Sequence, residues 1–399
     1  MKILIYHKVL SSLLGGGTFQ PLMFIAALQR HGEVTVALNE GADMAAVSKM
    51  AGVPIDVPAL KVVRLDPEGV KRREWLAAIL RTRKLKSLAK DADLCISTAN
   101  IMDFGKPGHH FVYLLSQFGG AAFYDYLMGR GHGFGARRLL RRFQTAFYEH
   151  VVKPLFGVRP LRRIVADRRE RIYPTSGYVE GILRGYFGPF NGTVFYPPTT
   201  FEFNDPSVPR DPLLAIYVGR IFPPKRITDL VDIVERAREI SGKDIKFRIA
   251  GVLAPIPYTD HLRKLASERP WMELAGPVYG KDKEKFMLSA TYALHAERDE
   301  AFGIAIAEYL KAGCIPIVPD TGGPKEIVDD RALEFHTVES AAVILSRLVG
   351  DDAFREARRS HCTARAAKFS LKAYKDHQQA IIDRMLGDVA QGKGQGDRK

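Results

Sequence analysis

The sequence predicts an α/β protein with two doubly wound domains in series. Its 399 residues exceed the length at which one hydrophobic core stops growing, about 250–300 residues. Short apolar runs alternate with helix-sized stretches in both halves, as in mainly parallel sheets covered by helices. A connector rich in proline and aspartate, at 205–212, separates the two series. We therefore expect a first domain at 1–204, a second at 205–369, a C-terminal helix at 370–386 that packs back toward the first domain, and a flexible tail at 387–399.

The first half opens with a β–loop–α unit. The apolar run at 3–6 predicts a strand, and a loop with glycines at 15–17 follows it. Apolar residues then recur at helical spacing up to Gly32, which supplies a C-terminal stop. Further strand-like runs lie at 33–38, 94–98 and 111–115. This order predicts the first doubly wound domain.

The second half restarts the pattern after the connector. Strand-like runs lie at 213–219, 245–251, 272–276, 291–296 and 315–319, with helical stretches between them. In open α/β sheets, ligands bind beyond the carboxyl ends of the strands. We therefore expect a cleft at the carboxyl ends of both sheets and look for the chemistry in the loops that follow strands.

Bulk composition indicates a soluble protein. Hydrophobic residues make up 46% and charged residues 26% of the chain. No apolar run approaches the roughly 18 residues of a membrane span, and the N-terminal run is too short for a signal peptide. The three cysteines, Cys95, Cys314 and Cys362, lie far apart, which fits a reducing compartment. We expect a cytoplasmic protein without a transmembrane helix.

The net charge of +14 is unevenly distributed. Between Arg130 and Arg171 there are eleven arginines and one lysine against three acidic residues, and a second basic cluster runs from Lys61 to Lys90. Such clusters favour the phosphates of nucleic acid or of an anionic membrane, although a merely solvated face is the alternative. The arginines lie in helical stretches without a nucleic-acid reader module or a stacking platform. We therefore expect an anionic membrane surface and no nucleic acid as the partner.

Two basic residues follow the first strand of the second domain. In VGRIFPPKR, Arg220 comes directly after the strand and Lys225 precedes a helix. Arginine binds oxyanions bidentately and lysine adds a point charge, so the pair suits a diphosphate. The alternative is an ordinary surface loop with basic residues.

Two glutamates bracket an apolar segment in EAFGIAIAEYLKAG. Glu300 lies just ahead of a predicted helix, and Glu308 lies about two turns inside it. The free N–H groups at a helix N-terminus attract phosphate. On spacing alone, an amphipathic helix with two solvated glutamates is equally consistent. In the third motif, GGPKEIV, Gly322 and Gly323 allow the backbone to approach a ligand closely.

These three motifs, over most of residues 196–370, together resemble the C-terminal domain of family-4 retaining glycosyltransferases of the GT-B fold, whose signature is two glutamates with seven residues between them. The resemblance implies two Rossmann-like domains facing a central cleft. It implies that Glu300 contacts the sugar of a nucleotide-sugar donor, that Glu308 bonds the ribose, and that Arg220 and Lys225 neutralise the diphosphate. Arg220, Lys225 and Glu300 are then the catalytic residues. The other donor contacts that it implies are Gly16, Gly17, Gly219, Pro277, Phe302, Gly303 and Ile304.

The acceptor side matches the family less closely. A histidine that the family often carries after a mid-domain strand has no clear counterpart, and the nearby candidates are His109, His110, Ser116 and Gln117. The YPP and GGP segments are reminiscent of mannosyltransferases that extend lipid-linked oligosaccharides.

The resemblance implies a retaining hexosyltransferase that moves a sugar, with mannose as one candidate, from a GDP- or UDP-linked donor to a hydroxyl of a glycan or lipid-linked acceptor. We expect no metal and no cofactor, and attachment to the cytosolic face of a membrane through the basic first domain. A nucleotide-sugar epimerase or a phosphorylase of the same fold is the alternative, and a basic nucleic-acid-binding protein is the alternative from another class.

Overall fold

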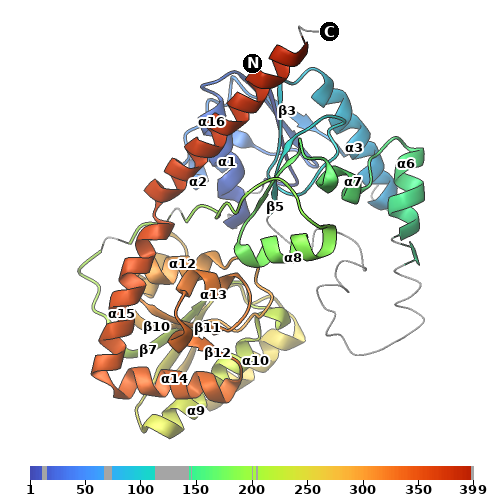
Figure 1. The fold of residues 1–399 in the computed structure, drawn as a ribbon. Coiled ribbons are helices and arrows are strands. Elements are labelled where there is room, and N and C mark those ends of the chain that lie inside the picture. The colour runs from blue at the N-terminus through green and yellow to red at the C-terminus, as the bar shows by residue number, and fades with distance from the viewer. Residues whose placement is uncertain are drawn as a thin grey trace. The chain divides into compact units, whose positions relative to one another are not determined.

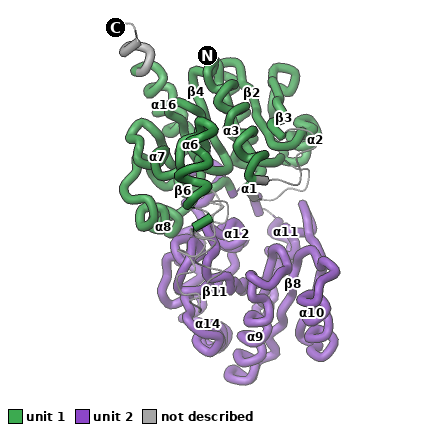
Figure 2. The backbone as a smooth tube through the Cα atoms, turned by 90° about the vertical axis from the view of Figure 1, so that its right-hand side faces the viewer, with its two compact units in different colours: residues 1–198, 375–399 green, residues 199–374 purple. Residues whose placement is uncertain are grey.

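The chain folds into two compact units, each with its own parallel sheet (Figures 1 and 2). Unit 1 comprises residues 1–198 and 375–399, and unit 2 comprises residues 199–374. Among the described residues each sheet has six strands, and the predicted α/β class with two doubly wound domains is confirmed. The computed structural model describes residues 1–10, 16–66, 74–112, 143–144, 146–199, 201–203 and 205–396.

Unit 1 has the strand order β3-β2-β1-β4-β5-β6, and all of its strand pairs are parallel. Its strands are β1 (Lys2–His7), β2 (Glu33–Leu38), β3 (Lys61–Arg64), β4 (Leu94–Ser97), β5 (His109–Val112) and β6 (Arg171–Pro174). Its helices are α1 (Gly16–Leu28), α2 (Met44–Ala51), α3 (Glu74–Lys90), the π-helical turn η2 (Tyr148–Val152), α6 (Lys153–Leu155), α7 (Leu161–Ala166) and α8 (Gly177–Phe187). The long helix α16 (Leu371–Gly396) begins in unit 2 and continues in unit 1.

Helix α16 differs from the prediction for the C-terminus. A flexible tail was expected at 387–399, but the helix continues through Gly396. Arg171 at the start of β6 donates two hydrogen bonds of 3.0 Å to the carboxylate of Asp388. This bidentate contact fixes the helix where its composition alone predicts no packing.

Unit 2 has the strand order β12-β11-β10-β7-β8-β9, again with parallel pairs. Its strands are β7 (Asp211–Val218), β8 (Lys246–Ala250), β9 (Met272–Gly276), β10 (Ala290–Leu294), β11 (Ile315–Pro319) and β12 (Glu334–Phe335). Its helices are η3 (Pro223–Lys225), α9 (Ile227–Ser241), α10 (Pro257–Glu268), α11 (Gly280–Leu288), α12 (Ile304–Lys311), α13 (Gly323–Val328), η4 (Arg331–Leu333), α14 (Val338–Gly350), α15 (Asp352–Ala366) and η5 (Ala367–Phe369).

The boundary between the units lies after Pro198, earlier than the expected boundary at 204. Residues of this stretch already bond to unit 2. The ammonium of Lys311 lies 2.9 Å from Glu202 and from the carbonyl oxygen of Thr199. These contacts attach the start of the connector to α12.

Burial explains why strands such as β10 and β11 read as continuous apolar runs. Strands β4, β5, β10 and β11 consist of buried residues over their whole length. Helices that cross between parallel strands cover a sheet, so its central strands must be apolar throughout. None of the described helices combines the length and hydropathy that a transmembrane segment requires.

Candidate functional site

The candidate residues of unit 2 follow three strands of its sheet. Arg220 and Lys225 come after β7, Glu300 after β10, and Gly322 and Gly323 after β11. Because the strands are parallel, these loops leave the sheet at the same edge. We refer to this edge as the carboxyl edge of unit 2.

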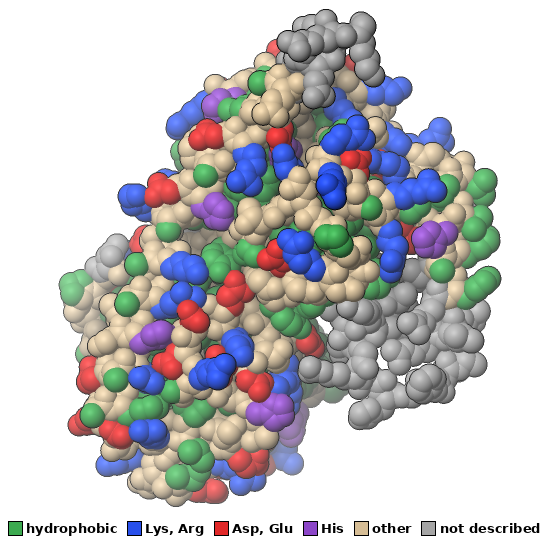
Figure 3. Space-filling view, in the orientation of Figure 1, with side chains coloured by type: hydrophobic (Ala, Val, Ile, Leu, Met, Phe, Trp, Pro, Cys, Tyr) green, Lys and Arg blue, Asp and Glu red, His purple; other side chains and the backbone are tan. Residues whose placement is uncertain are grey.

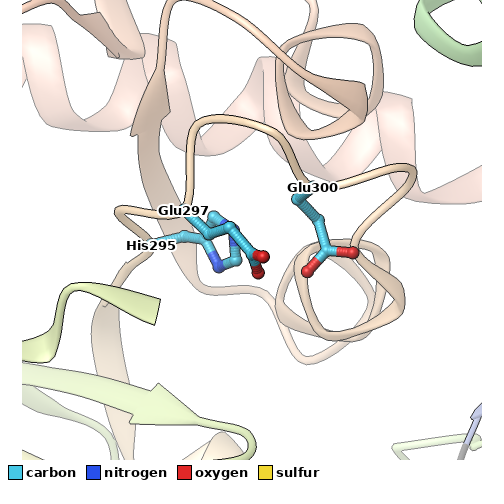
Figure 4. Close-up of side chains that lie close together, drawn as sticks. All are labelled: His295, Glu297 and Glu300. Carbon is cyan, nitrogen blue, oxygen red and sulfur yellow. The ribbon is translucent and has the colours of Figure 1, made fainter. Parts of the chain in front are cut away.

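Lys225 joins two of these loops through its ammonium group. Its Nζ atom lies 2.5 Å from Glu300 Oε2 and also contacts Glu297 Oε2. Figure 4 shows the carboxylates of Glu297 and Glu300 turned toward each other. All three side chains are largely buried, with 11% of Lys225, 21% of Glu297 and 19% of Glu300 exposed. The site therefore holds one positive group between two acids.

The two acids differ in how readily they bind a proton. Burial and the neighbouring Glu300 carboxylate raise the pKa of Glu297 to about 7. Burial also acts against the charge on Glu300, but the ammonium of Lys225 outweighs it and lowers the pKa of Glu300 to about 2. Burial likewise favours the neutral amine of Lys225, yet Glu300 and Glu297 hold its pKa above the usual value. Glu300 is thus the charged partner of Lys225, and Glu297 is the acid of the pair that takes up a proton first as the pH falls.

His295, the first residue after β10, lies beside these acids. Burial lowers the pKa of its ring to about 4, so the imidazole is neutral. Its Nε2 atom is buried without a hydrogen-bond partner. Donor atoms of His295, Glu297 and Glu300 lie within 4.8 Å of one another, a spacing that suits a metal ion. Since the Lys225 ammonium already contacts both carboxylates, we assign no metal to this group.

Two glycines shape the loop that carries Glu300. Gly303 precedes α12 with φ of 96°, a backbone conformation that favours glycine. A Cβ at Gly323 would lie 2.5 Å from Ala301 O and 2.5 Å from Phe302 Cα. Gly323 also donates a backbone hydrogen bond of 2.8 Å to Glu300 O. The TGG segment therefore packs its backbone directly against the Glu300 loop, and only glycine at position 323 allows the two backbones to approach this closely.

Glu308 lies inside α12 and pairs with a lysine from another helix. It is 7% exposed, and its Oε1 atom lies 2.6 Å from Nζ of Lys283 in α11. The Lys283 ammonium also lies 5.0 Å from the centre of the Phe201 ring. The alternative interpretation of the spacing, a solvated surface glutamate, is therefore wrong for Glu308.

The remaining predicted donor contacts of unit 2 lie along the same edge. Arg220 is exposed, and its guanidinium stacks over the Phe222 ring at 4.9 Å. Within the described part of the chain, Arg220 forms no ion pair. Three others sit at loop starts or helix starts: Gly219 follows β7, exposed Pro277 follows β9, and Ile304 is the first residue of α12. Phe302 is buried, with its ring 6.0 Å from that of Phe369.

The predicted residues of unit 1 fall into three groups. Gly16 and Gly17 lie in the first turn of α1, whereas the sequence placed them in a loop ahead of it. Ser116 and Gln117 lie outside the described residues. His109 and His110 are buried in β5, near its amino end and away from the carboxyl end of the strand.

The two histidines have partners inside unit 1. His110 Nε2 lies 2.8 Å from Glu170 Oε2, and Arg159 Nη2 lies 2.8 Å from Glu170 Oε1. The ring of His109 stacks on Tyr173, with centroids 6.1 Å apart. Burial lowers the pKa of His109 to about 3, so this ring is neutral. The geometry gives these residues a role in the core and offers no support for the predicted contact with an acceptor.

Three residues of the site escaped the sequence reasoning. Glu297 and His295 lie within HAERDE, where three acids and a histidine follow a strand within six residues. That density of titratable groups directly after a buried strand was the signal that marks them. Lys283 belongs to KDKEK, which looks like any charged surface helix and carries no such signal.

Comparison with known families covers the unit that holds this site. Residues 199–368 match the family model described as glycosyl transferases group 1. The matched residues lie within unit 2. No curated protein matches the chain at a significant level.

Solved structures are similar to almost the whole chain, and at their low sequence identity this similarity is one of fold. HepE of Anabaena, in complex with UDP and glucose, has a TM-score of 0.64 at 15% identity, covering 96% of this chain and 100% of that chain. WaaG, a glycosyltransferase involved in lipopolysaccharide biosynthesis, has a TM-score of 0.66 at 16% identity, covering 96% and 99%. Sucrose-phosphate synthase of Thermosynechococcus elongatus has a TM-score of 0.66 at 14% identity, covering 97% of this chain and 99% of that chain. The two-unit architecture is thus the GT-B fold.

Proposed function

We propose that the protein is a retaining glycosyltransferase that moves a sugar from a UDP- or GDP-linked donor to a hydroxyl of a glycan or lipid-linked acceptor, without a metal ion. One observation carries this proposal. A lysine and a glutamate, Lys225 and Glu300, meet beside the start of α12 within the residues that match the glycosyl transferases group 1 family.

Each part of this edge suits one part of the donor. Exposed Arg220 offers a bidentate site for a phosphate. The free backbone N–H groups at the start of α12 favour negative charge there. Glu308 offers a carboxylate for two neighbouring ribose hydroxyls, and charged hydrogen bonds of this kind are strong. Support for a UDP-linked donor comes from HepE, whose structure was solved with UDP-glucose.

The proposed reaction needs no protein nucleophile. The acceptor hydroxyl attacks the anomeric carbon on the face that the diphosphate leaves, and its proton passes to the departing phosphate oxygen. Arg220, Lys225 and the start of α12 stabilise the charge that builds on the leaving diphosphate, which is the main catalytic contribution. Glu300 holds the sugar in position for the attack.

We further propose that unit 1 docks on an anionic membrane from the cytosolic side and receives a lipid-linked acceptor there. An apolar stripe supports this partner. Its four side chains are four residues apart and exposed: Phe143 (68%), Phe147 (50%), Val151 (41%) and Leu155 (78%). This spacing places them on one helical face. In the space-filling view, hydrophobic side chains gather where α6 lies at the edge of unit 1 (Figure 3).

Basic residues lie next to the apolar stripe. The backbone N–H of Leu161 donates to Glu149 Oε2 at 3.2 Å, which attaches the start of α7 to the turn η2. Arg162 and Arg163, directly after Leu161, are exposed. Apolar side chains that enter the headgroup region and arginines that bind lipid phosphates are the two attractions that hold peripheral proteins on anionic bilayers.

Thermal-shift screening against UDP- and GDP-sugars, GDP-mannose among them, tests the donor. Turnover with a glycan or lipid acceptor, followed by NMR of the new linkage, tests the reaction. We expect retention of the anomeric configuration and full activity in the presence of a chelator. An epimerase would change the sugar of the donor without an acceptor, and a phosphorylase would require inorganic phosphate. Binding of no nucleotide sugar would contradict the proposal.

A further inference from the structure

We propose that Glu297 is a positioning residue of the donor site. Glu297 holds Lys225 while the site is empty, and it takes up a proton from solvent when the diphosphate of the donor draws Lys225 away. This inference rests on the proposed function, because it assumes that a diphosphate binds at the carboxyl edge of unit 2. It assigns Glu297 a role that the paired-glutamate signature does not include.

The geometry places Glu297 in competition with a phosphate. The Lys225 ammonium, which is the cation predicted for the diphosphate, contacts both Glu297 and Glu300. With 11% of its side chain exposed, Lys225 has little room for a third anion while both acids hold it. A diphosphate that binds to Lys225 must therefore replace at least one carboxylate. Glu297 is the one to release it, because Lys225 donates a hydrogen bond to Glu300, whereas its contact with Glu297 is an ion pair without hydrogen-bond geometry.

The two carboxyl groups also lie close together, with donor atoms within 4.8 Å of each other, so each disfavours the negative charge on the other. A proton therefore binds to Glu297 before Glu300, because burial and the Glu300 carboxylate raise the pKa of Glu297, whereas the Lys225 ammonium lowers the pKa of Glu300. Removal of the Lys225 charge and arrival of the negative diphosphate act in the same direction. Both raise the proton affinity of Glu297.

The other groups around the pair do not supply or remove this proton. His295 is neutral, because burial lowers its pKa to about 4. The Tyr217 hydroxyl, near the end of β7, donates a hydrogen bond of 3.0 Å to the carbonyl oxygen of Arg220. Burial raises the pKa of this hydroxyl far above the neutral range. The charge on Glu297 is thus set by Lys225 of η3 and by Glu300, which lies in the same loop as Glu297.

The buried, unpartnered Nε2 atom of His295 is a second observation that points to a ligand here. Its ring lies with Glu297 and Glu300 in one group of donor atoms. A polar atom that is buried without a partner is unfavourable unless something binds to it. A sugar hydroxyl of the donor is the partner that the proposed function provides.

Isothermal titration calorimetry of the full chain with UDP-glucose and GDP-mannose tests the inference. In these nucleotide sugars the diphosphate is a diester, so it does not titrate near neutral pH. Each titration is run in two buffers of different ionisation enthalpy, and the difference gives the protons taken up. For the wild type we expect uptake approaching about one proton near pH 8 and little near pH 6, where Glu297 is already protonated. The affinity should fall by up to about tenfold per pH unit above about pH 7.

Glu297→Gln is the informative variant, because glutamine keeps the shape of the side chain and removes the titration. It should take up no proton and bind the donor near pH 8 at least as tightly as the wild type. Glu339→Gln, at a carboxylate that is 66% exposed on α14, is the matched control and should behave as the wild type. Donor binding without proton uptake, or proton uptake that persists in Glu297→Gln, would overturn this inference and leave the proposed function standing. Absence of donor binding by the wild type would overturn the proposed function as well.

Discussion

Lys283 Nζ lies 2.6 Å from Glu308 Oε1, in an ion pair that joins α11 to α12 within unit 2. Glu308 is the more buried partner, with 10% of its side chain exposed against 20% for Lys283. A carboxylate held in this way by a lysine on one oxygen has a fixed direction. The pair therefore prepares Glu308 to accept hydrogen bonds from a ligand without first ordering its own side chain.

Glu308→Ala should weaken the binding of UDP or GDP by about 1–3 kcal/mol, the range for lost charged hydrogen bonds. Calorimetry with the free nucleoside diphosphates measures this loss. Lys264→Ala, at a lysine that is 73% exposed, serves as the control for a distant charge change. If Glu308→Ala binds both nucleotides as tightly as the wild type, Glu308 does not contact the ribose.

Glu300→Ala should lower turnover while changing the affinity for the free nucleoside diphosphate less than Glu308→Ala does. The reason is that Glu300 is assigned to the transferred sugar, which the free nucleotide lacks. Steady-state turnover and calorimetry on both variants separate the two roles. Equal losses of nucleotide affinity in the two variants would refute this division.

Arg220→Ala and Lys225→Ala should each reduce turnover by roughly 10²-fold or more, as the loss of a group that stabilises developing charge commonly does. The fold should be unaffected for Arg220, whose side chain is exposed. Arg236→Ala on α9, 54% exposed, is a control that removes one positive charge elsewhere. A double variant of Arg220 and Lys225 with full activity would exclude the diphosphate assignment.

Gly323→Ala should destabilise unit 2 by about 1–3 kcal/mol, because the added Cβ overlaps the backbone of the Glu300 loop. Turnover should fall with stability, since the loop must shift. Gly350→Ala is the matched control, because a Cβ there meets no atom within 4 Å. That variant should be unchanged or more stable by up to about 1 kcal/mol. Thermal and urea unfolding measure both, and equal stability of the two variants would disprove the support role of Gly323.

Liposome flotation tests the docking of unit 1. Binding should require anionic lipid and weaken at high salt, because each basic residue near the surface contributes about 1 kcal/mol and is screened over about 8–10 Å. Phe147→Ser combined with Leu155→Ser should reduce binding. Ile240→Ser, at an isolated apolar side chain that is 56% exposed on α9, should leave liposome binding unchanged. Binding that ignores lipid charge, or that is the same in all three proteins, would argue for a soluble acceptor.

Much of the fold followed from local sequence. Most buried strands were readable because a parallel sheet covered by helices favours apolar residues along a strand. The paired glutamates, the two basic residues after β7 and the two glycines after β11 were readable because each belongs to a short motif tied to a strand end. Strand ends of parallel sheets gather at one edge, so such motifs meet without further information.

Other features depended on contacts between distant segments. The C-terminal tail looked mobile by composition, yet Arg171 binds Asp388 across 217 positions of sequence. His109 and His110 were candidates because the resembled family often carries a histidine after a mid-domain strand, and these two lie near that position. Their partners, Tyr173 and Glu170, lie sixty or more positions further along the chain, and the strand register turns both rings into the core.

The sequence by itself determined the two-domain α/β class and the order of the strands along the chain, because these depend on local periodicity. It pointed to Arg220, Lys225, Glu300 and Glu308 through short motifs that together resemble a known family. Only the tertiary structure decided what those residues touch. It placed Lys225 between Glu297 and Glu300 and paired Glu308 with Lys283. The charge state of a buried acid depends on the groups that surround it in space. The proton affinity of Glu297 is therefore a property of the folded site, which spacing along the chain does not encode.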